Sequence, residues 1–303
     1  MFRKESTLVA IVCAFSACSL QGGEGDIYGD LYNAPGGKVL VVDGQNCNVF
    51  GRLQNFGTIY IFDSFWAQRE VQNSGLIEML GFWCSGEQGV RNAATGIVKG
   101  CGLIGSKSSS IDNRGLIWSV GGSLLLYSWD DPKRVGMSNT GILRNSPGTS
   151  LTAWVLVPNV GNQGTIEINA DGAVVFDCNL TNEPNALINL LGGTLSAKTI
   201  IQKAGATLEG FGGVTGNLAI DPNAIVTLAG PTNIVGDVTI AKGATLEIRD
   251  STIWVTGKVI CNGTIHLKSG DMIPQGGLSG DYHIIREPSI YSGVGQANPQ
   301  PRP

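Results

Sequence analysis

Aromatic side chains are concentrated in the first half of the chain. Five of the six tryptophans precede residue 160, and two tyrosines lie among them: Trp66, Trp83, Trp118, Trp129, Trp154, Tyr60 and Tyr127. Such rings combine a flat apolar face with a polar edge, which suits stacking against sugars. We predict a glycan-binding set made of Tyr60, Trp83, Trp118 and Trp129. The alternative is that these rings pack against the scaffold.

The charged segment Trp129–Arg134 is the candidate for catalysis. It holds two aspartates, a lysine and an arginine. Enzymes that cleave glycans need paired carboxylates, or a calcium site with a basic residue that abstracts a proton. The only histidines, His266 and His283, lie near the other end of the chain. We interpret the segment as a polar turn and predict no catalytic residue.

The cysteines do not form a framework. Five of them are scattered beyond residue 18: Cys47, Cys84, Cys101, Cys178 and Cys261. Without a Cys-x-x-Cys pair or a Cys/His cluster, the sequence predicts no metal site and no cofactor. Cys84 and Cys101 are about one repeat apart and would bridge if they stacked. We favour buried thiols that act as small apolar side chains.

The N-terminus is typical of an export signal. Arg3 and Lys4 precede an apolar run over residues 8–15, which small residues follow. We therefore assign residues 1–18 to a signal and expect a secreted or cell-surface protein. The sequence Phe15-Ser16-Ala17-Cys18 also resembles a lipobox, with Cys18 as the lipid-bearing residue. An ordinary cleavage site nearby is the alternative that we favour.

Composition restricts the fold and the partners. The chain has 303 residues, 44 of them glycine, and only 15% are charged. Glycine is a poor helix former, whereas short runs of Val, Ile, Leu and Thr between Gly and Asn predict many short strands. The net charge is −4 without a basic patch, which argues against nucleic-acid binding. No apolar run reaches the ~18 residues of a membrane span.

A repeated phrase organises these strands. It reads Asn-x-Gly-x-Ile at Asn55–Ile59 and Asn73–Ile77, and it becomes Gly-Ala-Thr-Leu at Gly243–Leu246. The period is about 20 residues, which indicates a solenoid. In this reading Ile59 and Ile61 point inward, while Asn and Gly form a turn with positive φ. Stacked Asn side chains are expected to bond along the axis.

The period also predicts two outward rows. The first is Thr58, Leu76, Ile97, Leu116, Ile142, Thr165, Thr207, Thr227, Thr245 and Thr264. The second is Tyr60, Glu78, Lys99, Trp118, Arg144, Glu167, Glu209, Ala229, Glu247 and His266. Because an exposed apolar stripe is usually covered, we expect inserted loops at 80–92 and 120–138 to lie over Leu76 to Ile142. The alternative cover is a binding partner.

These phrases resemble right-handed parallel β-helices, and are most similar to autotransporter passengers and haemagglutinin-type adhesins. The resemblance covers roughly residues 40 to 270. It implies an all-β, pectin lyase-like fold, a single-stranded right-handed solenoid of about 10–11 coils. We expect a leader at 19–37, the β-helix with terminal caps at 38–292, and a disordered tail at 293–303.

The same resemblance implies a non-enzymatic secreted or cell-surface protein with a structural or adhesive role. Its partner would be an extracellular glycan or a surface protein. The alternative is a carbohydrate-active enzyme, a polysaccharide lyase or glycoside hydrolase, because β-helices also carry such activities.

Overall fold

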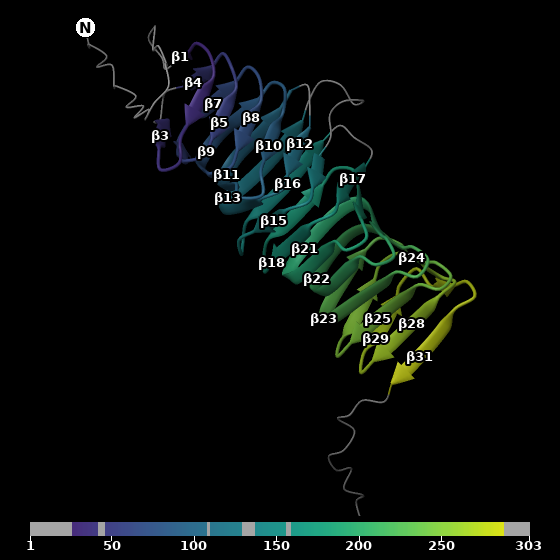
Figure 1. The fold of residues 1–303 in the computed structure, drawn as a ribbon. Coiled ribbons are helices and arrows are strands. Elements are labelled where there is room, and N and C mark those ends of the chain that lie inside the picture. Colours follow the sequence, from purple (N-terminus) through teal and green to yellow (C-terminus); the bar gives the residue numbers. More distant parts are fainter. Residues whose placement is uncertain (1–25, 42–45, 108–109, 129–136, 156–158, 288–303) are drawn as a thin grey trace, which may run out of the picture.

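The chain is a parallel β-solenoid of about 12 turns (Figure 1). The computed structural model describes residues 26–287 except 42–45, 108–109, 129–136 and 156–158. With strands stacked about 4.8 Å apart, the rod is roughly 60 Å long. The signal at 1–18 with Cys18, the tail at 293–303 and Trp129 lie outside the described residues. The right-handed winding stays a prediction.

Three parallel sheets form the walls of the rod, and the chain visits them in the order sheet 1, sheet 2, sheet 3 in every turn. Strands that belong to sheet 1 alone are β1 (Asp26–Ile27), β4 (Asn46–Val49), β7 (Ser64–Ala67), β16 (Ser150–Val155), β19 (Ala173–Phe176), β26 (Thr252–Val255) and β29 (Asp271–Pro274).

Sheet 2 contains β2 (Leu31–Asn33), β5 (Leu53–Asn55), β8 (Val71–Asn73), β10 (Val90–Asn92), β12 (Ile111–Asn113), β14 (Met137–Asn139), β17 (Asn159–Asn162), β20 (Asn179–Asn182), β24 (Val238–Ile240), β27 (Val259–Cys261) and β30 (Leu278–Ser279). Sheet 3 contains β3 (Lys38–Val41), β6 (Thr58–Ile61), β15 (Ile142–Asn145), β18 (Thr165–Asn169), β25 (Thr245–Arg249), β28 (Thr264–Lys268) and β31 (His283–Glu287).

Six longer strands bend around a corner and serve more than one sheet. They are β9 (Leu76–Gly86), β11 (Ile97–Ser106), β13 (Leu116–Ser128), β21 (Leu187–Gln202), β22 (Thr207–Ile220) and β23 (Ile225–Val235). The bends coincide with register shifts, such as the one between Gly100 and Gly102. Glycine permits such bends because it lacks a Cβ.

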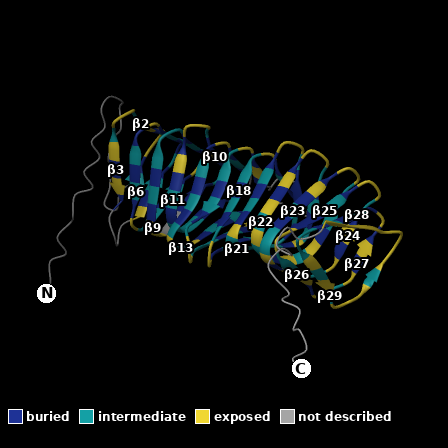
Figure 2. Cartoon of the chain, turned by 90° about the horizontal axis from the view of Figure 1, so that it is seen from below, coloured by how far each residue is buried: buried dark blue, intermediate teal, exposed yellow. Residues whose placement is uncertain are grey.

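A buried aliphatic core runs along the rod from Ile27 to Leu267 (Figure 2). The alternation of a strand points every second side chain inward. Ile59, Ile61, Leu246 and Ile248 are buried as the repeat predicts. Their outward neighbours are partly exposed, apart from the buried Glu247. One coil cannot bury its inward row alone, so each depends on the coils that flank it.

A ladder of buried amides runs along the end of sheet 2. Each Asn donates its Nδ2 proton to the Oδ1 of the Asn one coil further on, over 2.7–3.0 Å: Asn33, Asn55, Asn73, Asn92, Asn113, Asn139, Asn162, Asn182 and, as the last acceptor, Gln202. A second bond from Asn55 Nδ2 reaches the carbonyl of Leu76 at 3.1 Å. These hydrogen bonds confirm the predicted stacking of Asn. They also stabilise the rod, because a buried amide without a partner is costly.

The ladder ends where the repeat changes. Nε2 of Gln202 is buried and has no hydrogen-bond partner among the described residues. The next positions of that column are Ile220, Ile240 and Cys261. The last third of the rod thus replaces amide bonds by apolar contacts at this corner.

The turn before sheet 3 occurs in two forms, and the expected positive φ holds for only one. Where the phrase is Gly-Ala or Asn-Ala, as at Asn185, Gly205, Asn223 and Gly243, φ is between 64° and 80°. In the Asn-x-Gly form neither Asn55 nor Gly57 has a positive φ.

Close contact between coils explains the glycine of the Asn-x-Gly form. A Cβ on Gly141 would lie 2.1 Å from the carbonyl oxygen of Gly115, and one on Gly164 would lie 2.1 Å from that of Gly141. The turn-and-φ interpretation is therefore wrong for these positions. They need glycine because the backbone of the preceding coil passes where a side chain would be.

The strand register corrects two assignments in the outward rows. Thr207 pairs with Ile225 and Glu209 with Thr227. Thr227 therefore belongs to the second row, and Ala229 does not. The shift arises because the repeat was placed two residues late in this coil. The first row also includes Leu187, so its C-terminal half is not a continuous Thr face.

The stack is longer than expected at its N-terminal end. β1 and β2 lie within the range assigned to a leader, yet they pair in parallel with β4 and β5. β3 is part of a regular coil, and it pairs with β6. The extra turn accounts for about 12 turns in place of 10–11.

The expected covering loops are, where described, strands of the stack. Residues 80–86 belong to β9 and residues 90–92 are β10. Residues 120–128 belong to β13, and 129–136 lie outside the described residues. The prediction that segment 80–92 covers the apolar stripe is therefore wrong. Ile97 in that stripe remains exposed.

We predict that Asn113→Ala lowers the free energy of unfolding by about 3 kcal/mol. The change breaks the bonds to Asn92 and Asn139 and leaves their amides buried without full pairing. Urea denaturation followed by circular dichroism measures it. Asn233→Ala, at an exposed position of β23, is the control. Equal effects of the two changes would refute a stabilising role for the ladder.

We predict that Gly141→Ala destabilises the rod by about 3 kcal/mol or more, because its Cβ would overlap the backbone of Gly115. Gly161→Ala is the matched control. Its Cβ would meet only Oε1 of Glu183, at 3.9 Å, and its φ is not positive. Thermal unfolding of both variants should show a drop for Gly141→Ala only. A stable Gly141→Ala protein contradicts the close-contact explanation.

Candidate functional site

The predicted aromatic residues do not share one surface. Tyr60 and Trp118 lie on the outer row of sheet 3, separated by Glu78 and Lys99. Trp83 lies in the sheet 1 part of β9, where it pairs with Ser64 and Leu103, and its side chain is outside the described part. The structure thus divides the predicted set between two walls of the rod.

Trp118 is packed rather than presented. The guanidinium carbon of Arg144 lies 6.0 Å from the centre of its ring, within the range of a cation–π contact. Its indole N–H is buried and has no hydrogen-bond partner among the residues that the structure describes. Arg144 in turn pairs with Glu167 on the next coil. An arginine that covers the ring leaves little of it for a sugar.

Charge pairs along the same row tie successive coils together. Lys99 pairs with Glu78 over 3.1 Å. Near the C-terminal end, Glu247 is buried and contacts Arg249, His266 and Lys268. These pairs lie on the regular wall of sheet 3, so we assign them to the stability of the stack.

Two aromatic side chains on sheet 1, one exposed and one partly buried, form a pair that the sequence prediction did not select. Tyr127 of β13 and Trp154 of β16 lie opposite each other on adjacent strands. Their ring centres are 5.5 Å apart and the rings are nearly perpendicular, at 81°. Trp154 is 52% exposed. The alternation within β16 was the available signal, because it places Ser150, Thr152 and Trp154 on the outer side.

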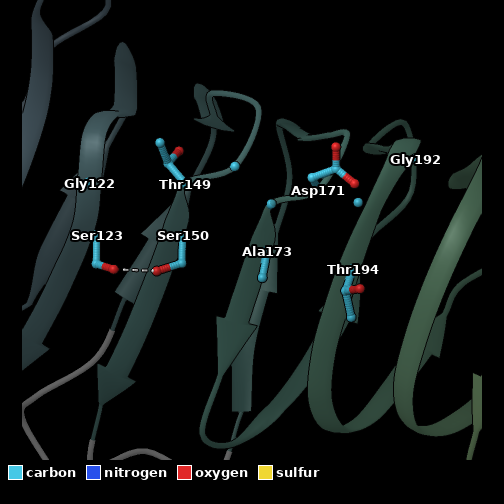
Figure 3. A pocket seen from close by; sticks show the side chains of 11 residues that line it. Gly122, Ser123, Thr149, Ser150, Asp171, Ala173, Gly192 and Thr194 are labelled. Atoms are coloured by element: carbon cyan, nitrogen blue, oxygen red, sulfur yellow. Dashed lines mark hydrogen bonds between the residues drawn. The ribbon is translucent and has the colours of Figure 1, made fainter.

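A groove borders the same strands at the corner between sheets 3 and 1 (Figure 3). It has a volume of about 470 Å³. Small and polar residues line it, namely Gly122, Ser123, Gly148, Thr149, Ser150, Asp171, Gly172, Ala173, Gly192, Gly193 and Thr194. Ser123, Ser150, Ala173 and Thr194 occupy successive strands along it (Figure 3).

Glycines let successive coils approach closely at this corner, and the missing side chains leave a groove on its surface. A Cβ on Gly172 would lie 1.9 Å from Nδ2 of Asn145, and one on Gly193 would lie 2.2 Å from the carbonyl oxygen of Asn169. Asp171 turns the chain with a φ of 55° and is exposed. The corner therefore keeps small residues for steric reasons, and a groove results.

Hydroxyl groups dominate the chemistry of the groove. Ser150 donates a hydrogen bond of 2.8 Å to Ser123, and Thr149 bonds to the carbonyls of Ser119 and Ser146. Asp171 is the one carboxylate among the described lining residues. Acid–base cleavage of a glycosidic bond uses two carboxylates, and the described lining supplies one. The lining suits hydrogen bonding to polyols.

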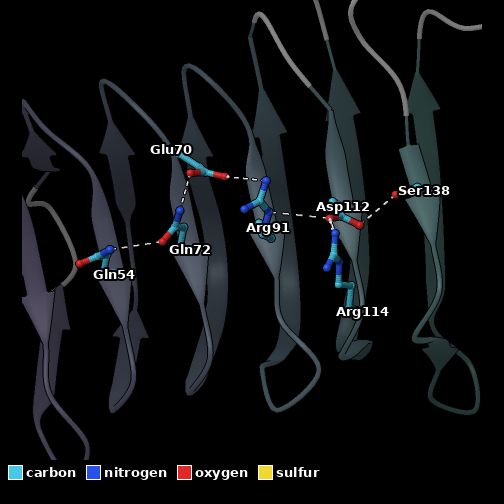
Figure 4. Close-up of polar contacts among 7 residues, drawn as sticks. All are labelled: Gln54, Glu70, Gln72, Arg91, Asp112, Arg114 and Ser138. Atoms are coloured by element: carbon cyan, nitrogen blue, oxygen red, sulfur yellow. Dashed lines mark hydrogen bonds and ion pairs between the residues drawn. The ribbon is translucent and has the colours of Figure 1, made fainter.

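A second, smaller groove of about 200 Å³ lies on sheet 2. Its side chains form a network across successive strands (Figure 4). Arg91 lies between Glu70, at 3.6 Å, and Asp112, at 3.8 Å. Both carboxylates have further donors, because Gln72 bonds to Glu70 over 2.6 Å and Ser138 to Asp112 over 3.0 Å. The network links coils and leaves neither carboxylate without a partner.

No group of three or more His, Cys, Asp or Glu residues able to hold a metal occurs in the described part of the chain. The five cysteines there form no disulfide. Cys84 pairs with Ile104, and Cys101 with Leu80, so the two do not stack. Burial raises the pKa of Cys84 to about 12, which keeps this thiol protonated and unreactive.

Nor does any helix in the described ranges have the length and apolarity needed to cross a membrane. Comparison with known proteins gives no family: no family model, no curated protein and no solved structure matches the chain. Function must therefore be argued from the surface itself.

We predict that Glu247 stabilises the C-terminal coils at neutral pH but not in acid. Burial raises the pKa of Glu247, but hydrogen bonds and charges from Lys268 and Arg249 outweigh it, so the pKa lies below its ordinary value of 4.5. A lowered folded-state pKa gives stability above the unfolded value, which is lost as the pH falls through the folded value.

Glu247→Gln should therefore cost about 2 kcal/mol near pH 7, and the difference from the unchanged protein should shrink below about pH 4. Denaturation midpoints at several pH values measure it. Glu209→Gln, an exposed position in the same row, is the control. A pH-independent loss would show that packing, not charge, is responsible.

Proposed function

We propose that the chain is a non-enzymatic, exported rod with an adhesive or structural role, which binds an uncharged glycan on the outer face of sheet 1. The binding face consists of the groove residues Ser123, Thr149, Ser150, Asp171 and Thr194, the strand residues Leu125, Thr152 and Val175, and the pair Tyr127 and Trp154. One observation carries the proposal: an exposed tryptophan shares strand β16 with a residue of the hydroxyl-lined groove.

The geometry of β16 supports a ligand several sugar units long. Ser150, Thr152 and Trp154 point outward at alternate positions, which places groove and ring about 13 Å apart at ~3.3 Å per residue. Between them, Leu125 and Val175 flank Thr152 on the neighbouring strands. An apolar strip between a polar groove and an aromatic ring matches the alternating faces of a sugar chain.

Charge favours a neutral ligand. Asp171 is the only charged side chain in the groove's described lining, and the chain carries a net charge of −4. A uronic acid or a sulfated sugar would meet this carboxylate without a cation to balance it. A neutral sugar would donate hydroxyl protons to it.

Export and surface display support the proposal from the sequence side. The signal-like residues 1–18 and the resemblance of the repeats to adhesins both favour a location outside the cell, where glycans are met. A rigid solenoid holds its outward residues at fixed spacing, which suits a binding face on a presented rod.

A carbohydrate-active enzyme is the second candidate, and the sheet 2 groove favours it. Glu70 and Asp112 both contact the guanidinium of Arg91, so their carboxylates are no more than roughly 10 Å apart, a spacing compatible with inverting hydrolysis. Their engagement by Arg91, Gln72, Arg114 and Ser138 argues for ion pairing instead.

We predict that Trp154→Ala weakens binding of a neutral oligosaccharide about tenfold or more, because the stacking platform is lost. A glycan array of the full chain identifies the ligand, and titration calorimetry compares the variants. Trp254→Ala is the matched control, since this tryptophan is also exposed and lies on sheet 1 at β26.

Reducing-sugar release is measured in the same samples. If the protein releases reducing sugar and Glu70→Gln abolishes that release, the enzymatic function is correct and the binding function is not. Equal loss of affinity in both tryptophan variants, or preference for sulfated glycans, would refute the sheet 1 face as the site.

A further inference from the structure

The two ends of the rod differ in how well their inward side chains are covered. At the N-terminal coil, Ile27, Leu31, Val39 and Val41 are exposed by 2% or less. At the C-terminal coil, the inward residue Ile284 is 37% exposed, although Ile265, its partner one coil earlier, is fully buried.

Other side chains of the last coil are also open. The inward residues Met272 and Leu278 are only partly buried. Ile273, Tyr282 and Ile285 are exposed as well. Large apolar side chains gathered on the end of a solenoid are the signature of a surface that another layer covers.

The backbone of this coil is open too. Within the described part of the chain, β29, β30 and β31 each pair with one strand only, namely β26, β27 and β28. Their free edges carry unpaired N–H and C=O groups that can receive a further strand. The residues of β29, β30 and β31 are all exposed or of intermediate burial, as the colours of Figure 2 show for β29.

We propose that the C-terminal coil is the interface of an end-to-end homodimer, in which two copies meet through β29, β30 and β31 about a two-fold axis perpendicular to the rod. A second copy is the occupant that the ends favour. Head-to-tail stacking would need an open N-terminal coil, whose inward row is already buried. Two identical open ends cover each other and close the assembly.

Such a two-fold axis makes the strands antiparallel and fixes the register of β31. Side chains that point into one rod must lie opposite side chains that point into the other, so Ile284 of each copy lies opposite Arg286 of its partner. His283, Ile285 and Glu287 point outward. Pairing centred on Ile285 uses all five residues. It places His283 opposite Glu287 of the partner copy at both ends of the strand pair.

Charge is self-complementary in this register. Oε1 of Glu287 contacts Nε2 of His266 in its own copy at 2.8 Å, and the Glu287 side chain is still 52% exposed. The exposed His283 of the partner copy can donate a hydrogen bond to the other carboxylate oxygen. Asp271 and Arg286 contact each other at 3.4 Å, and they place one negative and one positive charge on the same end of the rod. The end surface therefore attracts a copy of itself instead of repelling it.

The interface is small, so the dimer should be reversible. Only one cross-section of the rod is buried on each partner, and the paired strands span four, two and five residues. Interfaces of that class lie at the low end of the size range for specific complexes. Assembly should therefore depend on protein concentration.

Sedimentation velocity of the full chain across a range of concentrations tests the proposal. We expect a monomer–dimer equilibrium, and a loss of affinity of about tenfold or more for Ile285→Lys, which places two like charges together. Ile260→Lys on β27 is the control, because this isoleucine is equally exposed one coil before the end. Circular dichroism confirms that both variants fold.

A charge exchange tests the register. His283→Glu alone and Glu287→Lys alone should each weaken the dimer, and the double variant should recover most of the affinity. A monomer at all concentrations overturns the proposal. Oligomers that lengthen with concentration show head-to-tail stacking and also overturn it, as does a dimer that Ile285→Lys leaves unchanged.

Discussion

Every property of this rod depends on the hydrogen bonding of one coil to the next. Parallel strands at a spacing of about 4.8 Å place equivalent residues directly above one another. Each column must therefore satisfy its own chemistry, because a polar group in an inward column has only its neighbours as partners. The amide ladder from Asn33 to Gln202 is the strictest case. One amide both donates and accepts, so identical residues can pair without end.

That constraint explains what could be predicted from the sequence. The inward rows and the Asn column repeat the same residue types, so periodicity alone assigned Ile59, Ile61 and Asn55 correctly. The strand register was harder to predict where the sequence of the turn changed. Asn223 and Ala224 occupy the turn that Gly-Ala occupies elsewhere, and placing that coil two residues late moved Thr227 into the wrong row. The reason for Gly141 was not predictable, because only folding brings the backbone of Gly115 next to it.

The candidate binding face was also hard to predict from the sequence, because its position depends on where the strands bend. Composition identified the aromatic half of the rod but not the wall on which each ring lies. Long strands such as β13 turn a corner near Gly121 and Gly122, so Trp118 and Tyr127 of one strand lie on different sheets. Residue spacing does not reveal such a bend. The hydroxyl-lined groove arises at the same corner, where close contact with the preceding coil requires glycine at Gly172 and Gly193.

Each coil of the stack can be covered by a further equivalent coil. The last coil therefore exposes inward side chains and strand edges that the repeat itself does not cover. The N-terminal coil has its inward row buried, and the C-terminal coil does not. The outward residues are less restricted, because they contact solvent, although charge pairs among them, such as those of sheet 3, link successive coils. The proposed recognition on sheet 1 and the proposed assembly at β31 use different residues, so either can change without the other. The proposed binding face near Trp154 lies several coils from the C-terminal end, so the proposed dimer would leave both faces free and double the number of sites that one assembly presents.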